Sequence, residues 1–172
     1  QRQMCIRDRV RVGTLINSPL NTVIALDKSI KSPADLQGKK VGYSVSGIEQ
    51  ATLATMAQHA KIDPKSIKLI NVNFQLTSAL LAGQVDAVIG GYRNIEALEL
   101  KLQGKDPQVM NVEDYGVPAY DELVIVANRD EVHAAKIRAF LKALQKGVLT
   151  CALTRRRPGR RLPPRIPSST PN

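Results

Sequence analysis

The chain has 172 residues, of which 43% are hydrophobic and 23% charged, and its formal net charge is +10. This size and balance suit one soluble domain, or one lobe of a larger protein with part of another. Apolar runs fall short of the roughly 20 residues that a transmembrane helix needs. The charge does not indicate nucleic-acid binding, because residues 1–9 carry +2 and residues 151–172 carry +6, which leaves +2 for the residues between them.

The two ends of the chain differ from the middle. Residues 151–172 hold six arginines, five prolines and no acid, without hydrophobic periodicity. Such a segment cannot bury a core. We expect an out-of-frame or disordered tail there, with a basic arm for nucleic acid or anionic lipid as the alternative. Residues 1–10 are expected to be a non-native flank, so the chain is read as an internal fragment.

Strand and helix patterns alternate along the middle of the chain. Ser32 is typical of an N-cap and Pro33 of a first helical position, while Gly38, Gly83 and Gly147 are typical of helix ends. Strands are predicted over 22–26, 40–43, 67–73, 85–90, 108–112 and 122–128, and helices over 32–38, 47–61, 74–82, from an Asn94 cap to before Gly104, and over 130–146.

This alternation predicts an α/β fold with a largely parallel sheet and helices on both faces. Ligands of such sheets bind beyond the carboxyl ends of the strands, near a topological switch point. We therefore expect the loops 44–47, 73–74 and 90–94 to converge on a site.

The loop "SVSGIE" has two interpretations. Ser46 and Glu49 have the spacing of a capping box, in which each side chain satisfies a backbone N–H of the first helical turn. Alternatively, Gly47 lets a ligand approach the backbone at the helix N-terminus. Phosphate is disfavoured there because Glu49 repels anions, so a neutral or amine-bearing ligand is favoured.

Two further segments carry polar groups suited to a ligand. In "GGYRNIE", Tyr92 offers a stacking face, Arg93 a charged fork, Asn94 an amide and Glu96 a carboxylate. The alternative is a glycine turn with a helix cap and a solvated Arg–Glu pair. In "YGVPAYDEL" (115–123), Tyr120, Asp121 and Glu122 lie in a loop that either reaches a cleft or is simply solvated.

Catalytic patterns are weak. His59 and His133 are expected to be solvated, and no nucleophile elbow, Cys/His pair or metal-ligand spacing is present in the sequence. Carboxylates, a tyrosine and amides without a nucleophile or metal favour binding over turnover. We therefore predict a protein that is not an enzyme and needs no metal or cofactor.

Four segments resemble one family: "SPLNTVIAL", "KSPADLQGKKVGYSVSG", "LLAGQVDAVIGGYRN" and "GVPAYDELVIVAN". They are similar to the substrate-binding component of bacterial ABC importers, in the branch that binds thiamine-pyrimidine precursors. The resemblance covers about residues 12–148 and implies a type II periplasmic-binding-protein-like fold of two lobes. It implies a crossover strand in 11–30, a second lobe in 31–116 and a return strand and helix in 117–150, with most of the first lobe missing.

The resemblance also implies a partner and a location. The partners would be a small pyrimidine and a membrane permease but no nucleic acid, with a monomeric protein in the periplasm or anchored outside the membrane. An aminopyrimidine would lie in the interlobe cleft. The residues that we expect to contact it are Asn21, Ser44, Ser46, Gly47, Glu49, Asn73, Gly90, Tyr92, Arg93, Asn94, Glu96, Tyr120 and Glu122.

Two alternatives share this fold. One is an enzyme that makes the thiamine pyrimidine with iron and a cysteine-rich motif, but residues 10–150 contain no cysteine. The other is the effector-sensing module of a transcription regulator, which would carry a helix-turn-helix upstream. The identity of the pyrimidine is left open.

Overall fold

The computed structural model describes residues 8–154, which divide into two compact units. One unit comprises residues 14–124. The other comprises the described residues up to Gly13 and from Ile125 onward. The sequence-based boundaries at 11–30, 31–116 and 117–150 stay predictions. Residues 1–7 and 155–172, which include most of both predicted flanks, lie outside the described residues.

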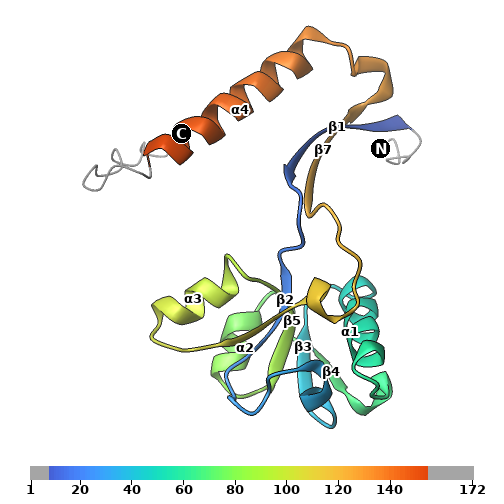
Figure 1. Cartoon of the computed structure of the whole chain (residues 1–172), viewed down its shortest axis with the longest axis vertical. Helices are drawn as coiled ribbons and strands as arrows, with labels where there is room; N and C mark the ends of the chain where they lie inside the picture. The colour runs from blue at the N-terminus through green and yellow to red at the C-terminus, as the bar shows by residue number, and fades with distance from the viewer. Residues whose placement is uncertain (1–7, 155–172) are drawn as a thin grey trace, which may run out of the picture. The chain divides into compact units, whose positions relative to one another are not determined.

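A five-stranded sheet forms the centre of the 14–124 unit (Figure 1). Its strands follow the order β4-β3-β5-β2-β6, with β3 parallel to both β4 and β5, and β2 antiparallel to both β5 and β6. Four strands therefore point one way and β2 points the other, which confirms a largely parallel sheet. Their bounds are β2 (Asn21–Ala25), β3 (Lys40–Tyr43), β4 (Lys68–Asn71), β5 (Ala87–Tyr92) and β6 (Gln108–Asn111).

The central strands are buried on both faces because helices cover both. All five residues of β2 are buried, and side chains alternate along it: Val23 and Ala25 enter one apolar cluster and Ile24 enters the other. In the same way, β5 places Ala87 and Ile89 in the first cluster and Val88 in the second. Continuous apolar runs of this kind are typical of strands in doubly covered sheets.

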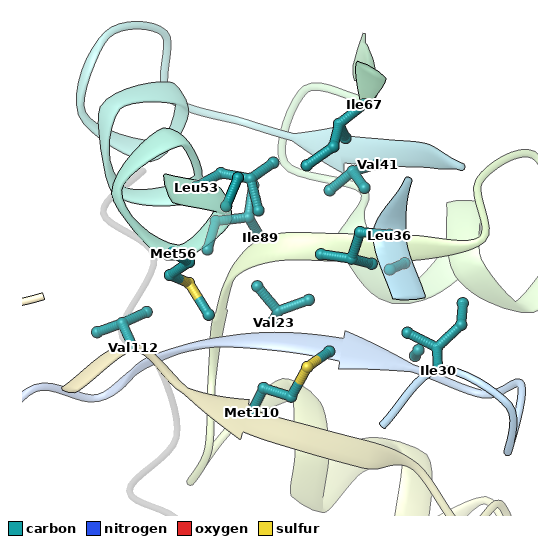
Figure 2. Packing of buried hydrophobic residues seen from close by; sticks show 13 residues of the cluster. Val23, Ile30, Leu36, Val41, Leu53, Met56, Ile67, Ile89, Met110 and Val112 are labelled. Atoms are coloured by element: carbon teal, nitrogen blue, oxygen red, sulfur yellow. The ribbon is translucent and has the colours of Figure 1, made fainter. Parts of the chain in front are cut away.

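Helix α1 (Ile48–His59) packs on one face of the sheet, whereas α2 (Leu76–Leu81) and α3 (Glu96–Leu102) pack on the other. Figure 2 shows Leu53 and Met56 of α1 directed at Val23, Val41 and Ile89 of the sheet. The opposite cluster joins Leu76 and Leu80 of α2 to Leu100 of α3. The predicted helices on both faces are thus confirmed.

Short 3₁₀ turns connect several elements. The bounds are η2 (Pro33–Leu36), η3 (Pro64–Ser66), η4 (Val112–Tyr115) and η5 (Arg129–Glu131). Ser32 is the N-cap of η2, as predicted, and Pro33 is its first residue. The Asp35 carboxylate accepts the Ser32 N–H at 2.9 Å and the Lys31 N–H at 3.0 Å. The hydrogen bond from the Lys31 N–H, followed by those from the Ser32 hydroxyl and the Ser32 N–H, lowers the pKa of Asp35.

The second unit contains the larger part of β1 (Arg9–Ile16) and of β7 (Leu123–Asn128), together with α4 (Ala135–Thr154). The two strands form their own two-stranded sheet, and the Leu141 side chain of α4 lies close to Gly13. The helix predicted over 130–146 is confirmed from Ala135 onward, but its predicted start at 130 and its predicted end at Gly147 are wrong. Residues 129–131 form a separate turn, and α4 continues through Gly147 because one glycine inside a helix costs only about 1 kcal/mol.

Replacing Gly147 with alanine should stabilise the protein by about 0.5–1 kcal/mol. A Cβ at this position meets nothing within 4 Å, and Gly147 does not have the positive φ that an alanine would resist. The measurement is the free energy of unfolding in urea, followed by circular dichroism. Gly147→Pro is the opposite control, since proline breaks a helix interior. Destabilisation by Gly147→Ala would contradict a helix that runs through this residue.

Within residues 8–154, no helix combines the length and apolarity that crossing a bilayer requires.

Candidate functional site

A cavity of about 420 Å³ opens within the 14–124 unit, at the edge of the sheet where β3 and β5 end. Its residues come from the start of β2, the loop after β3, the first turn of α1, the segment between β4 and α2, the end of β5, the start of α3 and the loop before β7. They are Asn21, Ser44, Val45, Ile48, Glu49, Phe74, Leu76, Gly90, Tyr92, Ile95, Glu96, Tyr120 and Glu122.

Sheet topology explains why distant segments meet at this cavity. β3 and β5 are parallel neighbours, so their carboxyl ends lie at the same edge. The chain leaves β3 for α1 and β4 on one side, whereas β5 lies on the other, which makes this a topological switch point. β2 is antiparallel, so its first residue, Asn21, pairs with Tyr92 at that same edge. The Asn21 Oδ1 accepts the Gly90 N–H at 3.1 Å.

Glu49 is a buried carboxylate in the wall of this cavity, with only 6% of its surface exposed. Its Oε2 accepts the backbone N–H groups of Ser44 at 2.7 Å and of Val45 at 3.1 Å. Gly90 makes room for it: a Cβ there would lie 2.3 Å from the Glu49 Oε1. The fold therefore holds this carboxylate between the loop after β3 and the end of β5.

The predicted capping box of Ser46 and Glu49 is wrong. The N-cap of α1 is Gly47, with φ of 91°, and Gln50 Oε1 accepts its N–H at 3.1 Å. Glu49 instead closes the loop that precedes the helix. The sequence pattern was misread by one position, because Gln50 and not Glu49 stands three residues after the cap. The positive φ also means that position 47 resists β-branched residues.

Tyr92 and Tyr120 line the cavity beside Glu122. The Tyr92 hydroxyl donates to Glu122 Oε1 at 3.0 Å, and the Tyr92 N–H donates to Glu96 Oε2 at 2.6 Å. Burial, followed by the hydrogen bond to Glu122 and its charge, raises the pKa of the Tyr92 phenol. Burial and the charge of Glu122 raise the pKa of Tyr120 to about 12. Both phenols are therefore neutral at physiological pH, and the Tyr92 oxygen, whose proton is donated to Glu122, can still accept a hydrogen bond.

The cavity lining carries three carboxylates, those of Glu49, Glu96 and Glu122. Among its described lining residues none is Lys, Arg or His. Arg93, the nearest predicted cation in sequence, donates instead from Nη2 to both Glu113 carboxylate oxygens, at 2.7 and 2.9 Å. An uncompensated acidic lining favours cations and hydrogen-bond donors and repels anions.

Large apolar side chains complete the lining, and sequence analysis did not single them out. They are Val45, Ile48, Phe74, Leu76 and Ile95, and the most exposed are Phe74 at 86% and Ile48 at 67%. The sequence could have indicated two of them, because Val45 and Phe74 are apolar residues inside loops that were expected to converge on a site. Apolar walls around a few polar groups are the usual make-up of a small-molecule pocket.

The structure brings together eight of the thirteen residues predicted to contact a ligand, namely Asn21, Ser44, Glu49, Gly90, Tyr92, Glu96, Tyr120 and Glu122. It places the other five outside the lining: Ser46, Gly47, Asn73, Arg93 and Asn94. Asn94 is not a helix cap either, because α3 begins after Ile95. For each of these residues, contact with a ligand stays a prediction.

Within residues 8–154, no three or more His, Cys, Asp or Glu side chains are grouped as a metal ion would require. Cys151 is exposed and free.

A family model described as NMT1/THI5 like matches residues 8–153. A Haemophilus influenzae protein named for thiamine biosynthesis is 53% identical over 138 residues, which cover 80% of this chain and 44% of that protein. The formylaminopyrimidine-binding protein of Halalkalibacterium halodurans is 40% identical over 141 residues, covering 80% and 43%. A Legionella pneumophila 4-amino-5-hydroxymethyl-2-methylpyrimidine phosphate synthase is 34% identical over 91 residues, covering 52% and 28%.

Among solved structures, the periplasmic aliphatic sulphonate binding protein of Escherichia coli matches with a TM-score of 0.58 and 21% identity. The match covers 80% of this chain and 46% of that one. It confirms the predicted periplasmic-binding-protein-like α/β fold. The chain spans less than half the length of the first two curated relatives.

Proposed function

The chain belongs to the NMT1/THI5-like family, and we propose that it is the solute-binding part of an ABC importer for a pyrimidine precursor of thiamine. The pyrimidine binds in the acidic cavity without chemical change, outside the cytoplasmic membrane, and passes to a membrane permease. Two findings support this proposal. A relative 40% identical is named for binding formylaminopyrimidine, and the fold is that of a periplasmic binding protein.

The observation that carries the proposal is the charge of the cavity. Glu49, Glu96 and Glu122 line it, and no described lining residue is cationic. An aminopyrimidine presents an exocyclic amine that donates hydrogen bonds, and carboxylates are the strongest neutral-pH acceptors for it. Glu49 and Glu96 are the acceptors that we assign to this amine, because Glu122 has a partner on each oxygen, whereas the partners of Glu49 and of Glu96 fall on Oε2 alone.

The remaining groups suit a flat heteroaromatic ring. The Tyr92 hydroxyl donates to Glu122 and the Ser44 hydroxyl to the Asn73 carbonyl, so both hydroxyl oxygens can accept a hydrogen bond from the ligand amine. Phe74 and the tyrosine rings offer faces for stacking. A cavity of about 420 Å³ lies within the range of small-molecule sites. The proposal therefore replaces Ser46 and Gly47, which lie outside the lining, with Ser44 and the two tyrosines as the hydroxyl groups that face the ligand.

The rival function is pyrimidine synthesis, since one relative is named as a synthase whose product is a phosphate ester. A cavity lined by three carboxylates suits the unphosphorylated amine better than that product. Placing like charges together costs several kcal/mol. The affinity of the protein for the phosphate ester, relative to that for the unphosphorylated pyrimidine, therefore distinguishes the two functions.

We expect 4-amino-5-hydroxymethyl-2-methylpyrimidine to bind the protein expressed from its complete open reading frame, and its phosphate ester to bind at least about 10-fold more weakly. The ester brings negative charge to the carboxylates, and a tenfold change corresponds to about 1.4 kcal/mol. Isothermal titration calorimetry of this matched pair measures both dissociation constants. Chromatography of the incubated mixtures shows whether the ligand is recovered unchanged.

Equal affinity for the ester, or conversion of the ligand, would contradict the proposal. Binding of an alkanesulphonate but not of the aminopyrimidine would do so as well.

A further inference from the structure

Glu122 differs from the other two carboxylates of the cavity in that each of its oxygens has a separate partner. Oε1 accepts the Tyr92 hydroxyl at 3.0 Å, and Oε2 accepts the Leu20 N–H at 2.8 Å. Both contacts are partly buried. A carboxylate committed on both oxygens has less capacity to accept from a ligand than Glu49, whose hydrogen bonds to Ser44 and Val45 both fall on Oε2.

Tyr92 is held from two directions by carboxylates. Its backbone N–H donates to Glu96 and its hydroxyl donates to Glu122, while β5 pairs it with Asn21 of β2. The backbone contacts fix the position of the residue, whereas the phenol is held by its hydrogen bond to Glu122. Without that anchor the ring would lose its fixed orientation at the cavity wall, because an unanchored side chain regains rotational freedom.

We propose that Glu122 is a positioning residue for the ligand: it holds the Tyr92 phenol in the cavity wall and does not itself neutralise the ligand amine. This inference rests on the proposed function, since it assigns roles within the same site. Tyr92 then contacts the ligand, and Glu122 acts through Tyr92.

The same carboxylate also joins two segments that are remote in sequence. Leu20 lies between β1 and β2, and Glu122 lies between η4 and β7. The Leu20 carbonyl oxygen accepts the Arg93 N–H at 3.0 Å, just after Tyr92. Glu122 thus connects the cavity wall with both segments through which the chain leaves the 14–124 unit. A residue in this place orders the wall before any ligand arrives, which lowers the entropic cost of binding.

Replacing Glu122 by glutamine removes the negative charge but keeps a side chain that can hold Tyr92 and Leu20. The Gln oxygen can accept the Leu20 N–H while the amide N–H donates to the Tyr92 oxygen, since a phenol both donates and accepts. We expect Glu122→Gln to bind 4-amino-5-hydroxymethyl-2-methylpyrimidine within about 3-fold of the unmodified protein. Glu122→Ala removes both anchors and should weaken binding about 10-fold or more. Calorimetry with the protein from its complete open reading frame measures both variants.

Two further variants complete the design. Tyr92→Phe keeps the ring and removes the anchored hydroxyl, so adding Glu122→Ala to it should cost less affinity than Glu122→Ala alone. Glu99→Gln removes a carboxylate that does not line the cavity and should stay within about 2-fold, which controls for overall charge. If Glu122→Ala does not fold, the glutamine and phenylalanine variants still decide the question.

Hydrogen exchange of the Leu20 amide in ligand-free protein gives an independent readout. Protection should be retained in Glu122→Gln and fall in Glu122→Ala. If Glu122→Gln loses 10-fold or more in ligand affinity while its Leu20 amide stays protected, the charge of Glu122 contacts the ligand directly, and the inference is overturned. Unchanged affinity in Glu122→Ala would overturn it too. If the unmodified protein binds no aminopyrimidine, the proposed function fails, while the exchange measurement still reports on the Glu122 anchor.

Discussion

Gly90→Ala should lower the free energy of unfolding by about 3 kcal/mol and abolish ligand binding. Gly90 has φ of 95°, a region in which L-residues other than glycine are strained by about 1–2 kcal/mol. A Cβ at this position would also lie 2.3 Å from Oε1 and 2.5 Å from Cδ of the buried Glu49. Overpacking of this kind costs typically about 1–3 kcal/mol. Urea denaturation measures the stability, and calorimetry measures the binding.

Gly83→Ala is the matched control for Gly90→Ala. Gly83 also has a positive φ, of 67°, but a Cβ there meets nothing within 4 Å. The variant therefore carries the backbone strain without the collision and should cost about 1 kcal/mol with no loss of binding. If the two variants are equally destabilised, the close approach of Glu49 to Gly90 is not what requires glycine.

The order of elements in the 14–124 unit was predictable because its local patterns agree with its packing. The apolar run 22–26 and the run "VDAVIG" both became buried strands, and Leu53, Met56 and Ala57 face the core as the helical period indicates. The direction of β2 was not predictable in the same way. Its residues are buried on both faces whichever way the strand runs, so nothing in the local pattern distinguishes parallel from antiparallel pairing.

The candidate site was partly predictable because strand ends in α/β sheets gather polar residues at one edge. Tyr92, Glu96 and Glu49 were found by this rule. The ion pair of Arg93 was not predictable, because its partner Glu113 lies 20 residues away in the sequence and only the fold brings the two together. Phe74 was not predicted, because polar groups at strand ends indicate a site in the sequence, whereas an apolar side chain in a loop does not reveal that it forms a cavity wall.

Glu49→Gln should leave the stability within about 1 kcal/mol and weaken binding of the aminopyrimidine by about 10-fold to 100-fold. The amide oxygen can still accept the N–H groups of Ser44 and Val45, which now share Oε2 of the carboxylate at 2.7 and 3.1 Å. The charge that favours the ligand amine is lost, and hydrogen bonds to charged groups contribute about 1.5–3 kcal/mol. Calorimetry and urea denaturation of the same preparation measure both quantities.

Two variants in the same segment show whether this carboxylate serves its loop or the ligand. Glu49→Ala removes the acceptor of both N–H groups and should cost about 2–3 kcal/mol of stability as well as the binding. Ser46→Ala should change neither quantity by more than about 0.5 kcal/mol, because Ser46 is exposed and its hydroxyl lies 3.4 Å from Gln50 Oε1. If Glu49→Gln binds like the unmodified protein while Glu49→Ala is destabilised, the carboxylate only closes the loop after β3. The ligand amine must then be held by Glu96, the other carboxylate of the cavity that we assign to it.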